Sequence, residues 1–204
     1  MTRLSRDFYL GDTVEIAQKL LGCCLVRKLG GETLVCRITE TEAYVGRMDK
    51  ACHAYGGRRT PRTEVMFGEA GHAYIYFTYG MHHCLNFVTE PEGEASAVLI
   101  RGLEPILGLD TMSYNRFGKP FAEQSSYQRK NFLNGPGKLT QALALTREQN
   151  GLDLTACDEL FVIHSPAELG IKTENTDFTI CCGKRIGIDY AEEAVDFPWR
   201  FWIK

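Results

Sequence analysis

Apolar residues recur at helical spacing in one clear stretch near the N-terminus, between positions 14 and 21. Asp12 stands just before this stretch and Glu15 follows three residues later, which is the pattern of a helix-capping box. Gly22 comes directly after the last apolar position, where a helix commonly ends. The pattern therefore predicts a short amphipathic helix.

An alternation of period two runs from Leu34 to Tyr44 and predicts a β-strand. Every second residue of a strand points to the same face. The residues expected on one face are Leu34, Cys36, Ile38, Glu40, Glu42 and Tyr44. The predicted face begins apolar and becomes acidic at its C-terminal end. Two carboxylates in this arrangement are expected to lie roughly 7 Å apart.

Other segments complete the predicted fold. Further strands are predicted over 73–79 (AYIYFTY), 82–88 (HHCLNFV), 96–104 (SAVLIRGLE), 185–189 (RIGID) and 197–204 (FPWRFWIK). Gly80 would join the first two as a hairpin. Pro136 favours a helix that begins there and ends near Gly151. Residues 53–64 show no periodicity and predict an ordered loop. Strands and helices without regular alternation favour an α+β fold around a mostly antiparallel sheet.

The composition is that of an ordinary globular protein, with 44% hydrophobic and 24% charged residues in a chain of 204. A chain of this length is expected to form a single domain, residues 1–204, around one core. No apolar run approaches the ~18 residues of a membrane helix, and the N-terminus lacks the apolar stretch of a secretory signal. We therefore expect a soluble protein inside the cell with no membrane partner.

Eight cysteines are numerous for such a protein, but no two of them form a C-x-x-C motif. Cys23/Cys24 and Cys181/Cys182 are adjacent pairs, and adjacent side chains in a strand point to opposite faces. Neither pair can form a local metal clamp or an easy disulfide. We expect small buried hydrophobic residues in a reducing compartment, with no bound metal and no cofactor.

The formal net charge of −3 argues, taken alone, against a nucleic-acid partner. It hides a local asymmetry, however. Residues 47–62 hold five Lys and Arg against one Asp, a net charge of +4, and residues 115–147 hold six against one Glu, a net charge of +5. The rest of the chain must then carry −12. The simplest interpretation is a basic face on an acidic body, which would attract a polyanion.

Glu40 and Glu42 are the most informative candidates for chemistry, because the sequence has no G-x-G-x-x-G, P-loop, G-x-S-x-G or H-E-x-x-H motif. Two carboxylates with room for a water between them suit the hydrolysis of a glycosidic bond. A strand end that carries ordinary exposed charges would give the same pattern. The pattern alone leaves both interpretations open.

Seven segments resemble one known family. They are ETEAYVG (40–46), DKACH (49–53), GGRRTPR (56–62), MF (66–67), AYIYFTYGMHHCLNFV (73–88), AVLIRGLEP (97–105) and GPGKLTQAL (135–143). In this order they are similar to the alkyladenine, or 3-methyladenine, DNA glycosylases, and they span nearly the whole chain. We accordingly expect a curved sheet with flanking helices and a protruding β-hairpin.

The resemblance implies an enzyme that flips a damaged purine nucleotide out of duplex DNA and hydrolyses its N-glycosidic bond. Glu42 matches the general base that activates a water, and Arg101 and the backbone carbonyl of Ile186 match the groups that orient this water. No Lys stands at the matched catalytic positions, so we expect neither a Schiff base nor strand cleavage. The implied substrates are alkylated or deaminated purines: 3-methyladenine, 7-methylguanine, hypoxanthine and ethenoadenine.

The resemblance also implies which residues hold the DNA. The side chains that stack on the flipped base are matched by Tyr44, His53 and Tyr76. Asn86 matches the residue that excludes the 2-amino group of normal guanine. Tyr79, beside the hairpin glycine, matches the side chain inserted where the flipped nucleotide was. The contacts to the DNA backbone are matched by Thr60, Arg62, Met66 and Lys138.

Two other functions are compatible with parts of this pattern. A carbohydrate glycosidase could use Glu40 and Glu42, but it would need sugar-stacking Trp residues nearby, and both Trp residues lie at the far C-terminus. A module that recognises distorted DNA without catalysis would not need Glu42 as a base. The expected partner is double-stranded DNA with a damaged purine, bound by a monomer in the bacterial cytoplasm or nucleoid, or in a eukaryotic nucleus.

Overall fold

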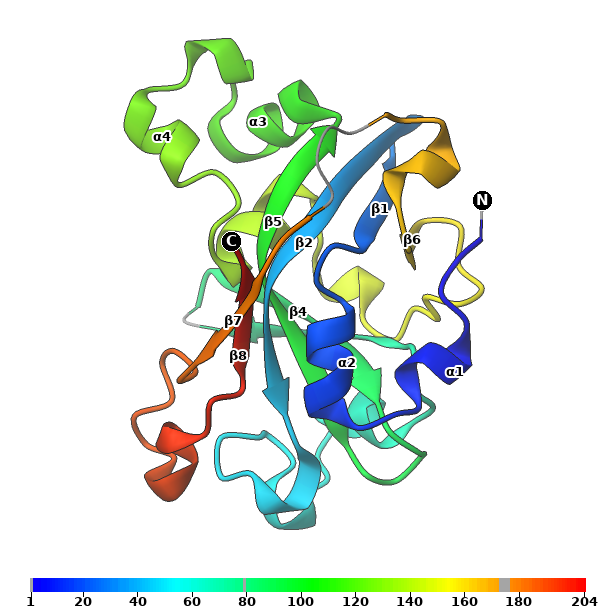
Figure 1. Cartoon of the computed structure of the whole chain (residues 1–204), viewed down its shortest axis with the longest axis vertical. Coiled ribbons are helices and arrows are strands. Elements are labelled where there is room, and N and C mark those ends of the chain that lie inside the picture. The colour runs from blue at the N-terminus through cyan, green and yellow to red at the C-terminus, as the bar shows by residue number, and fades with distance from the viewer. Residues whose placement is uncertain (1, 79, 173–176) are drawn as a thin grey trace.

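One eight-stranded sheet runs through the computed structural model, which describes residues 2–78, 80–172 and 177–204 (Figure 1). The strands are β1 (Cys24–Leu29), β2 (Glu32–Tyr44), β3 (Ala73–Thr78), β4 (His82–Thr89), β5 (Ser96–Leu107), β6 (Leu160–Ile163), β7 (Ile180–Gly183) and β8 (Arg200–Ile203). The described helices are α1 (Arg6–Tyr9), α2 (Thr13–Lys19), α3 (Leu109–Phe117), α4 (Ser126–Lys130) and α5 (Pro136–Ala142). The strand order is β3-β4-β5-β2-β1-β6, and β7 and β8 join through β2. The pairings between these strands are antiparallel, so the predicted α+β class is confirmed.

β2 is the longest strand, and it changes partner along one of its edges. Its first half pairs with β1 up to Arg37, and its second half pairs with β8 from Glu40 to Glu42. The other edge pairs with β5, but its register shifts between Ile38 and Glu40 and again between Glu40 and Thr41. Such shifts mark a β-bulge, which bends the strand and re-aims its side chains. The bulge lies where one partner strand gives way to the other.

The bulge makes the predicted face of β2 wrong. Leu34, Cys36 and Ile38 belong to the main core, as predicted, but the next core residue on the strand is Ala43, an odd number of positions later. Glu42 and Tyr44 therefore lie on the sheet face opposite the main core. A period-two pattern cannot reveal an extra residue in a bulge, because it assumes that the alternation continues without interruption.

The N-terminal helix is confirmed as α2. The Asp12 side chain accepts a hydrogen bond from the Glu15 amide at 2.9 Å, which caps the first turn. Ile16, Ala17 and Leu20 of the apolar stripe are fully buried. The hydroxyl of Thr41 on β2 donates to the carbonyl of Ala17 at 2.7 Å. This contact fixes the bulged half of β2 from its core side.

Three other predictions need correction. The helix that begins at Pro136 ends at Ala142 rather than near Gly151, and Ala144, two residues on, has a positive φ of 48°. Residues 185–189 form no strand; the last two strands are β7, which precedes this segment, and β8. The Cys23/Cys24 pair is buried as expected, but Cys181 is half-buried and Cys182 is exposed, because β7 pairs with β8 alone.

α5 lies directly beside the hairpin of β3 and β4. The hydroxyl of Thr140 donates to the carbonyl of His83 at 2.9 Å. A Cβ at Gly137 would come within 2.9 Å of the His82 ring, so only glycine permits this approach. The start of α5 thereby reaches the rim of the pocket described below. Within the described ranges, no helix has the length and apolar character needed to cross a bilayer.

Candidate active site

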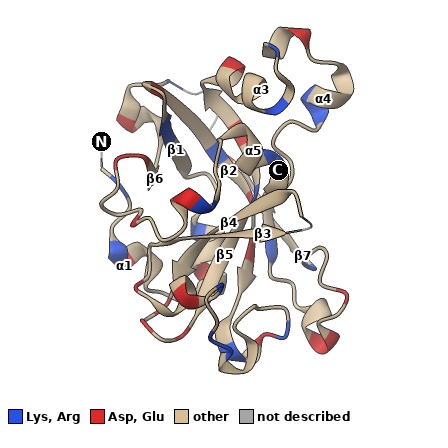
Figure 2. Ribbon diagram, turned by 180° about the vertical axis from the view of Figure 1, so that it is seen from behind, with Lys and Arg blue, Asp and Glu red and all other residues tan. Residues whose placement is uncertain are grey.

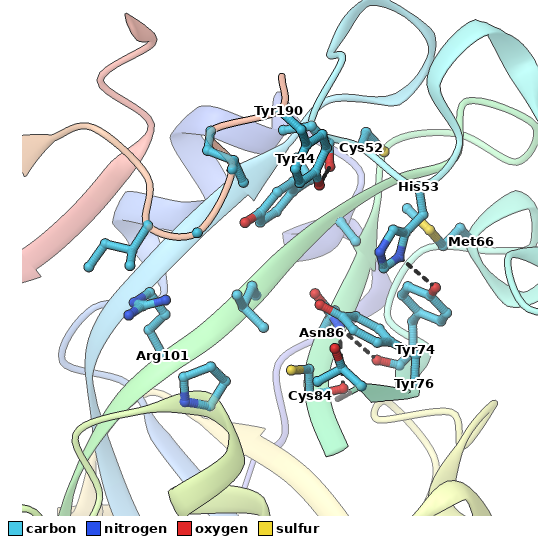
Figure 3. A pocket seen from close by; sticks show the side chains of 18 residues that line it. Tyr44, Cys52, His53, Met66, Tyr74, Tyr76, Cys84, Asn86, Arg101 and Tyr190 are labelled. Carbon is cyan, nitrogen blue, oxygen red and sulfur yellow. Dashed lines mark hydrogen bonds between the residues drawn. The ribbon is translucent and has the colours of Figure 1, made fainter. Parts of the chain in front are cut away.

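A pocket of about 410 Å³ opens on the sheet face opposite the main core (Figure 3). The strand register explains its lining, because directly paired residues share a face. Glu42 of β2 is paired with Leu99 of β5, Leu99 with Asn86 of β4, and Asn86 with Tyr74 of β3. The neighbours two positions along also face the pocket, among them Tyr44, Tyr76, Cys84 and Arg101. Residues from the loops 51–53 and 186–190 close it.

Glu42 is fully buried beside this pocket. Its Oε1 accepts a hydrogen bond from the Ile186 amide at 2.9 Å, and its Oε2 accepts one from the Tyr44 hydroxyl at 2.8 Å. The Arg101 Nε lies 3.6 Å from Oε1. Burial raises the pKa of Glu42 above its ordinary value, while Arg101, the Ile186 amide and the Tyr44 hydroxyl oppose this rise. A carboxylate held in this way can accept a proton from a water.

Glu40 lies near Glu42, but its carboxylate is held by two arginines. Its Oε1 is 3.2 Å from the Arg101 Nε and 3.2 Å from an Nη of Arg200 on β8. Arg101 thus contacts both carboxylates. Glu40 is half-buried and lines a separate hollow, not the aromatic pocket. Its geometry favours a role in holding Arg101.

Aromatic side chains face one another across the pocket, with Tyr44 on one side and His53, Tyr74 and Tyr76 on the other (Figure 3). His53 packs edge-on against Tyr76, with 4.6 Å between ring centroids, and its Nδ1 lies 3.0 Å from the Tyr74 hydroxyl. Burial and the neighbouring Arg62 lower the pKa of His53 to about 4. His53 is therefore neutral at physiological pH.

Arg62 is exposed at the surface, and its guanidinium also contacts these aromatic side chains. Its guanidinium carbon is 4.8 Å from the Tyr76 ring centroid, and its Nη2 is 3.3 Å from the Nε2 of His53. Because a guanidinium can only donate hydrogen bonds, Nε2 must be the acceptor and Nδ1 must carry the proton. The structure thereby assigns the His53 tautomer. Arg62, expected to contact the DNA backbone, also holds His53, a residue of the aromatic pocket.

The other predicted residues have different surroundings. Asn86 is buried in the pocket wall and its Nδ2 donates to the Tyr74 carbonyl at 3.0 Å. Met66 is also buried and lines the pocket, so its side chain is not exposed to a DNA backbone. Thr60 bonds with Thr63 within its own loop. Lys138 contacts the side-chain oxygens of Asn131 and Asn134. Tyr79 lies outside the described residues.

Several pocket residues were not predicted. Tyr74 and Cys84 could have been found from the alternation of β3 and β4, since each lies two positions from a predicted pocket residue. Ile188 and Tyr190 carry no such signal, because they belong to an irregular segment that reaches the pocket only in the folded chain. The same holds for Arg185, which is buried behind Tyr44.

The two basic segments extend to opposite ends of the molecule and meet where Arg62 and Arg147 line one hollow beside β3. Figure 2 shows Lys and Arg in the loop at the lower end, residues 47–62, and around α3 and α4 at the upper end. In the loop, Lys50 pairs with Glu192 and Glu193, and Arg59 pairs with Glu64, so part of the charge is offset locally. The single basic face stays a prediction, because the charges of the two segments are spread between the two ends of the molecule and the hollow that Arg62 and Arg147 share.

Trp202 lies close to Glu40, although the position of Trp202 at the C-terminus suggested that it would be distant from Glu40 and Glu42. It is paired with Glu40 across β2 and β8, although the two residues are far apart in sequence. Its ring is 4.6 Å from the Arg200 guanidinium, which itself binds Glu40. Distance from Trp along the chain thus does not argue against a carbohydrate glycosidase. In the part of the chain that the structure describes, no group of three His, Cys, Asp or Glu residues could hold a metal ion.

Comparison with known proteins identifies the class of protein that carries this aromatic pocket and the buried carboxylate at its side. The profile of the family described as methylpurine-DNA glycosylase (MPG) matches residues 7–204. The chain therefore belongs to this family, and it is a DNA-repair hydrolase that acts on N-glycosyl bonds. The family membership sets aside the carbohydrate glycosidase.

Its relatives agree along the full length. A protein of Clostridium perfringens (strain SM101 / Type A) is 51% identical over 202 residues, covering 99% of this chain and 96% of the relative. Proteins of Clostridium acetobutylicum and Alkaliphilus oremlandii are 50% and 47% identical, cover 99% of this chain, and are themselves covered to 94% and 96%. All three carry the provisional name 3-methyladenine DNA glycosylase.

Proposed function

We propose that this protein hydrolyses the N-glycosidic bond of a damaged purine flipped out of double-stranded DNA, using a water activated by Glu42. One observation carries the proposal: Glu42 is fully buried at the side of an aromatic pocket, and an amide, a hydroxyl and a guanidinium hold its carboxylate. A buried carboxylate without catalytic use would lower stability, so its presence beside an open pocket favours a chemical role.

In the proposed reaction Glu42 takes a proton from the water as the water oxygen attacks C1′ of the sugar. The bond between C1′ and the purine nitrogen breaks, and the base leaves with the bonding electron pair. Arg101 contacts Glu42 and lines the pocket, which supports a role in orienting the water and the carboxylate. The carbonyl of Ile186 is the second proposed water ligand, and the neighbouring Ile186 amide already binds Glu42.

The flipped base would stack between Tyr44 on one side and His53 and Tyr76 on the other. Purines alkylated at a ring nitrogen are cationic, and the face of an aromatic ring attracts a cation. A neutral His53 adds no repulsive charge to the pocket. Asn86 in the pocket wall would exclude the 2-amino group of normal guanine. We propose 3-methyladenine, 7-methylguanine, hypoxanthine and ethenoadenine as substrates, and Tyr79 as the side chain that fills the gap in the duplex.

The product would be an abasic site in an uncut strand. Strand cleavage by a glycosylase requires an amine that attacks C1′, and no Lys is among the described residues that line the pocket. Attack by water therefore has a candidate general base at the pocket, whereas attack by an amine has no Lys nucleophile there. We propose that the enzyme acts as a monomer, since one chain supplies the whole set of pocket residues.

The test uses duplex oligonucleotides that each contain one of the four damaged bases. The wild-type protein should release free base and leave a strand that breaks only after alkali. Glu42→Gln keeps the shape but cannot take the proton, so excision should fall by about 100-fold or more while lesion binding persists. Glu40→Gln is the matched control and should retain more activity. No base release by the wild-type protein, or equal losses in both variants, would contradict the proposal.

A further inference from the structure

Arg185 and Asp49 form an ion pair behind the pocket, and both side chains are fully buried. The Arg185 Nη2 donates to Oδ1 of Asp49 at 2.8 Å, and its Nη1 donates to Oδ2. Burying two charges is costly, and a buried pair is weak evidence for added stability. Its presence calls for a purpose other than stability.

The Arg185 guanidinium connects several segments around the catalytic strand. Its Nη1 donates to the carbonyl of Ala43 at 2.8 Å and its Nη2 to that of Ala194 at 3.2 Å. Its carbon atom lies 4.8 Å from the Tyr44 ring centroid and 5.1 Å from that of Trp199. Arg185 thus holds β2 through the carbonyl directly before Tyr44 and through the Tyr44 ring itself.

Asp49 extends the same connection into the loop that carries His53. Its Oδ2 accepts from the Val45 amide at 3.2 Å, directly after β2, and its Oδ1 accepts from the Ala51 amide at 3.0 Å. The loop turns at Gly46, where a Cβ would lie 2.4 Å from the Glu94 carbonyl oxygen. The pair therefore ties the end of β2 to the loop before the stacking histidine.

Arg185 is also the residue before Ile186, whose amide binds Glu42 at 2.9 Å. The position of that amide depends on where the backbone leaves the anchored arginine. Residues 185–189 do not pair as a strand, so no β-ladder holds them. Side-chain anchoring replaces the ladder.

We propose that the Asp49–Arg185 pair positions the reaction: it holds the Ile186 backbone against Glu42 and the Tyr44 ring in the base pocket. Both side chains are fully buried and neither lines the pocket, so they are positioning residues rather than catalytic ones. The link to catalysis rests on the proposed function, whereas the link to the geometry of Ile186 does not. Arg185→Lys keeps a positive charge but lacks the planar fork that reaches all four acceptors. Asp49→Asn keeps the shape and loses the charge.

A matched control comes from Arg27 on β1, a second buried arginine, whose side chain is 4% exposed and pairs with Glu159 away from the pocket. Arg27→Lys should lower the melting temperature as Arg185→Lys does, without touching the site. The first measurement is amide hydrogen exchange at Ile186 under conditions where each variant is folded. Exchange should accelerate in Arg185→Lys and Asp49→Asn and stay at the wild-type rate in Arg27→Lys.

The second measurement is single-turnover base excision as a function of pH. The Asp49 and Arg185 variants should lose about 10- to 100-fold in rate, the usual effect of a small misplacement. The charged and titratable groups that face Glu42 are Tyr44 and Glu40 on β2 and Arg101 on β5, with Arg200 on β8 behind Glu40. Because the donors from Ile186 and Tyr44 favour the carboxylate, their displacement should move the acid limb of the profile to higher pH.

Each result decides a separate claim. Unchanged Ile186 exchange in both site variants would overturn the positioning proposal whether or not the protein excises bases. Equal rate losses and equal pH limbs in Arg27→Lys and Arg185→Lys would show that the pair only stabilises the fold. A wild-type protein that releases no base would instead overturn the proposed function, and the exchange result would still test the geometry.

Discussion

The hydroxyl of Tyr44 donates a hydrogen bond of 2.8 Å to Oε2 of Glu42, two residues earlier on β2. The Tyr44 ring lines the pocket, and Glu42 is fully buried beside it. Residues two apart share a strand face, so one strand delivers both the stacking ring and the proton acceptor. One side chain therefore contacts the proposed base site with its ring and the proposed general base with its hydroxyl.

Tyr44→Phe separates these two roles, because it keeps the ring and removes the donor. The Tyr44 hydroxyl lowers the pKa of Glu42, so its loss should raise that pKa further and move the acid limb of the excision rate to higher pH. At neutral pH the rate should fall by about 10-fold, the scale of one hydrogen bond to a charged group. Single-turnover excision measured across the pH range checks this.

Tyr76→Phe is the control for that experiment. The Tyr76 ring also lines the pocket. Burial raises the pKa of the Tyr76 hydroxyl most, and the next contribution comes from Cys84 rather than from Glu42. This variant should leave the acid limb where it is in the wild-type protein. Equal shifts in the two variants would mean that the Tyr44 hydroxyl has no special link to Glu42.

The stability of Glu42→Gln should depend on pH in a defined direction. Burial raises the pKa of Glu42, so the folded protein keeps this proton at pH values where the unfolded chain has lost it. The stability contributed by the neutral carboxyl is full below the unfolded-state pKa of about 4.3 and is lost as the pH rises through the folded-state pKa. Gln has no such loss.

Relative to the wild-type protein, Glu42→Gln should therefore gain stability as the pH rises above the unfolded-state pKa of about 4.3, while it loses activity. Thermal unfolding of both proteins over this range measures the difference in melting temperature. A stability difference that does not change with pH, or that increasingly favours the wild-type protein, would show that Glu42 ionises in the folded state as easily as in water.

His53 should titrate far below an ordinary histidine. Burial is the first cause and Arg62 the second, and together they lower the pKa of His53 to about 4. NMR of the ring protons should show the neutral form down to about pH 5. In Arg62→Ala the pKa of His53 should rise but stay below 6.5, because desolvation remains. A pKa near 6.5 in the wild-type protein would remove the argument for a neutral pocket.

The sequence pattern predicted the regular helices and strands of this fold. It failed where contacts between segments distant in sequence determine the structure. The helix at α2 and the hairpin of β3 and β4 follow from local spacing and turn residues, and both are confirmed. The bulge in β2 depends on the exchange of β1 for β8 as its partner, which no local pattern records. The prediction that Glu42 shares a face with the main core was therefore wrong. Its choice as a candidate rested on its spacing from Glu40 and on the resemblance to the glycosylase family, and neither depends on which face meets the core.

The C-terminal segment was the least predictable part of the site. Residues 185–189 have the composition of a strand, but Asp49 binds the Arg185 side chain and Glu42 binds the Ile186 amide. Gly187, with φ of 76°, then turns the chain. These partners are more than a hundred positions away in sequence, so only the folded chain brings them together.

Both basic segments are expected to contact the DNA backbone. Arg58 in the loop and Lys130 on α4 are exposed, and they represent the lower and upper ends of the molecule. Arg62 is excluded from this test because it also contacts His53 and Tyr76. If both basic segments contact phosphates, Arg58→Ala and Lys130→Ala should each weaken binding to lesion-containing and intact duplexes by similar factors. Each loss should also reduce the slope of log affinity against log salt by about one.

Lys50→Ala provides the matched control, since Glu192 and Glu193 already offset the charge of Lys50. It should change the salt slope much less than Arg58→Ala. Affinity titrations at several salt concentrations measure all three variants. If only Arg58→Ala weakened binding, the loop would contact the DNA and α4 would lie beyond the bound duplex. A change in lesion preference rather than in overall affinity would contradict phosphate contact, because phosphates carry no information about the base.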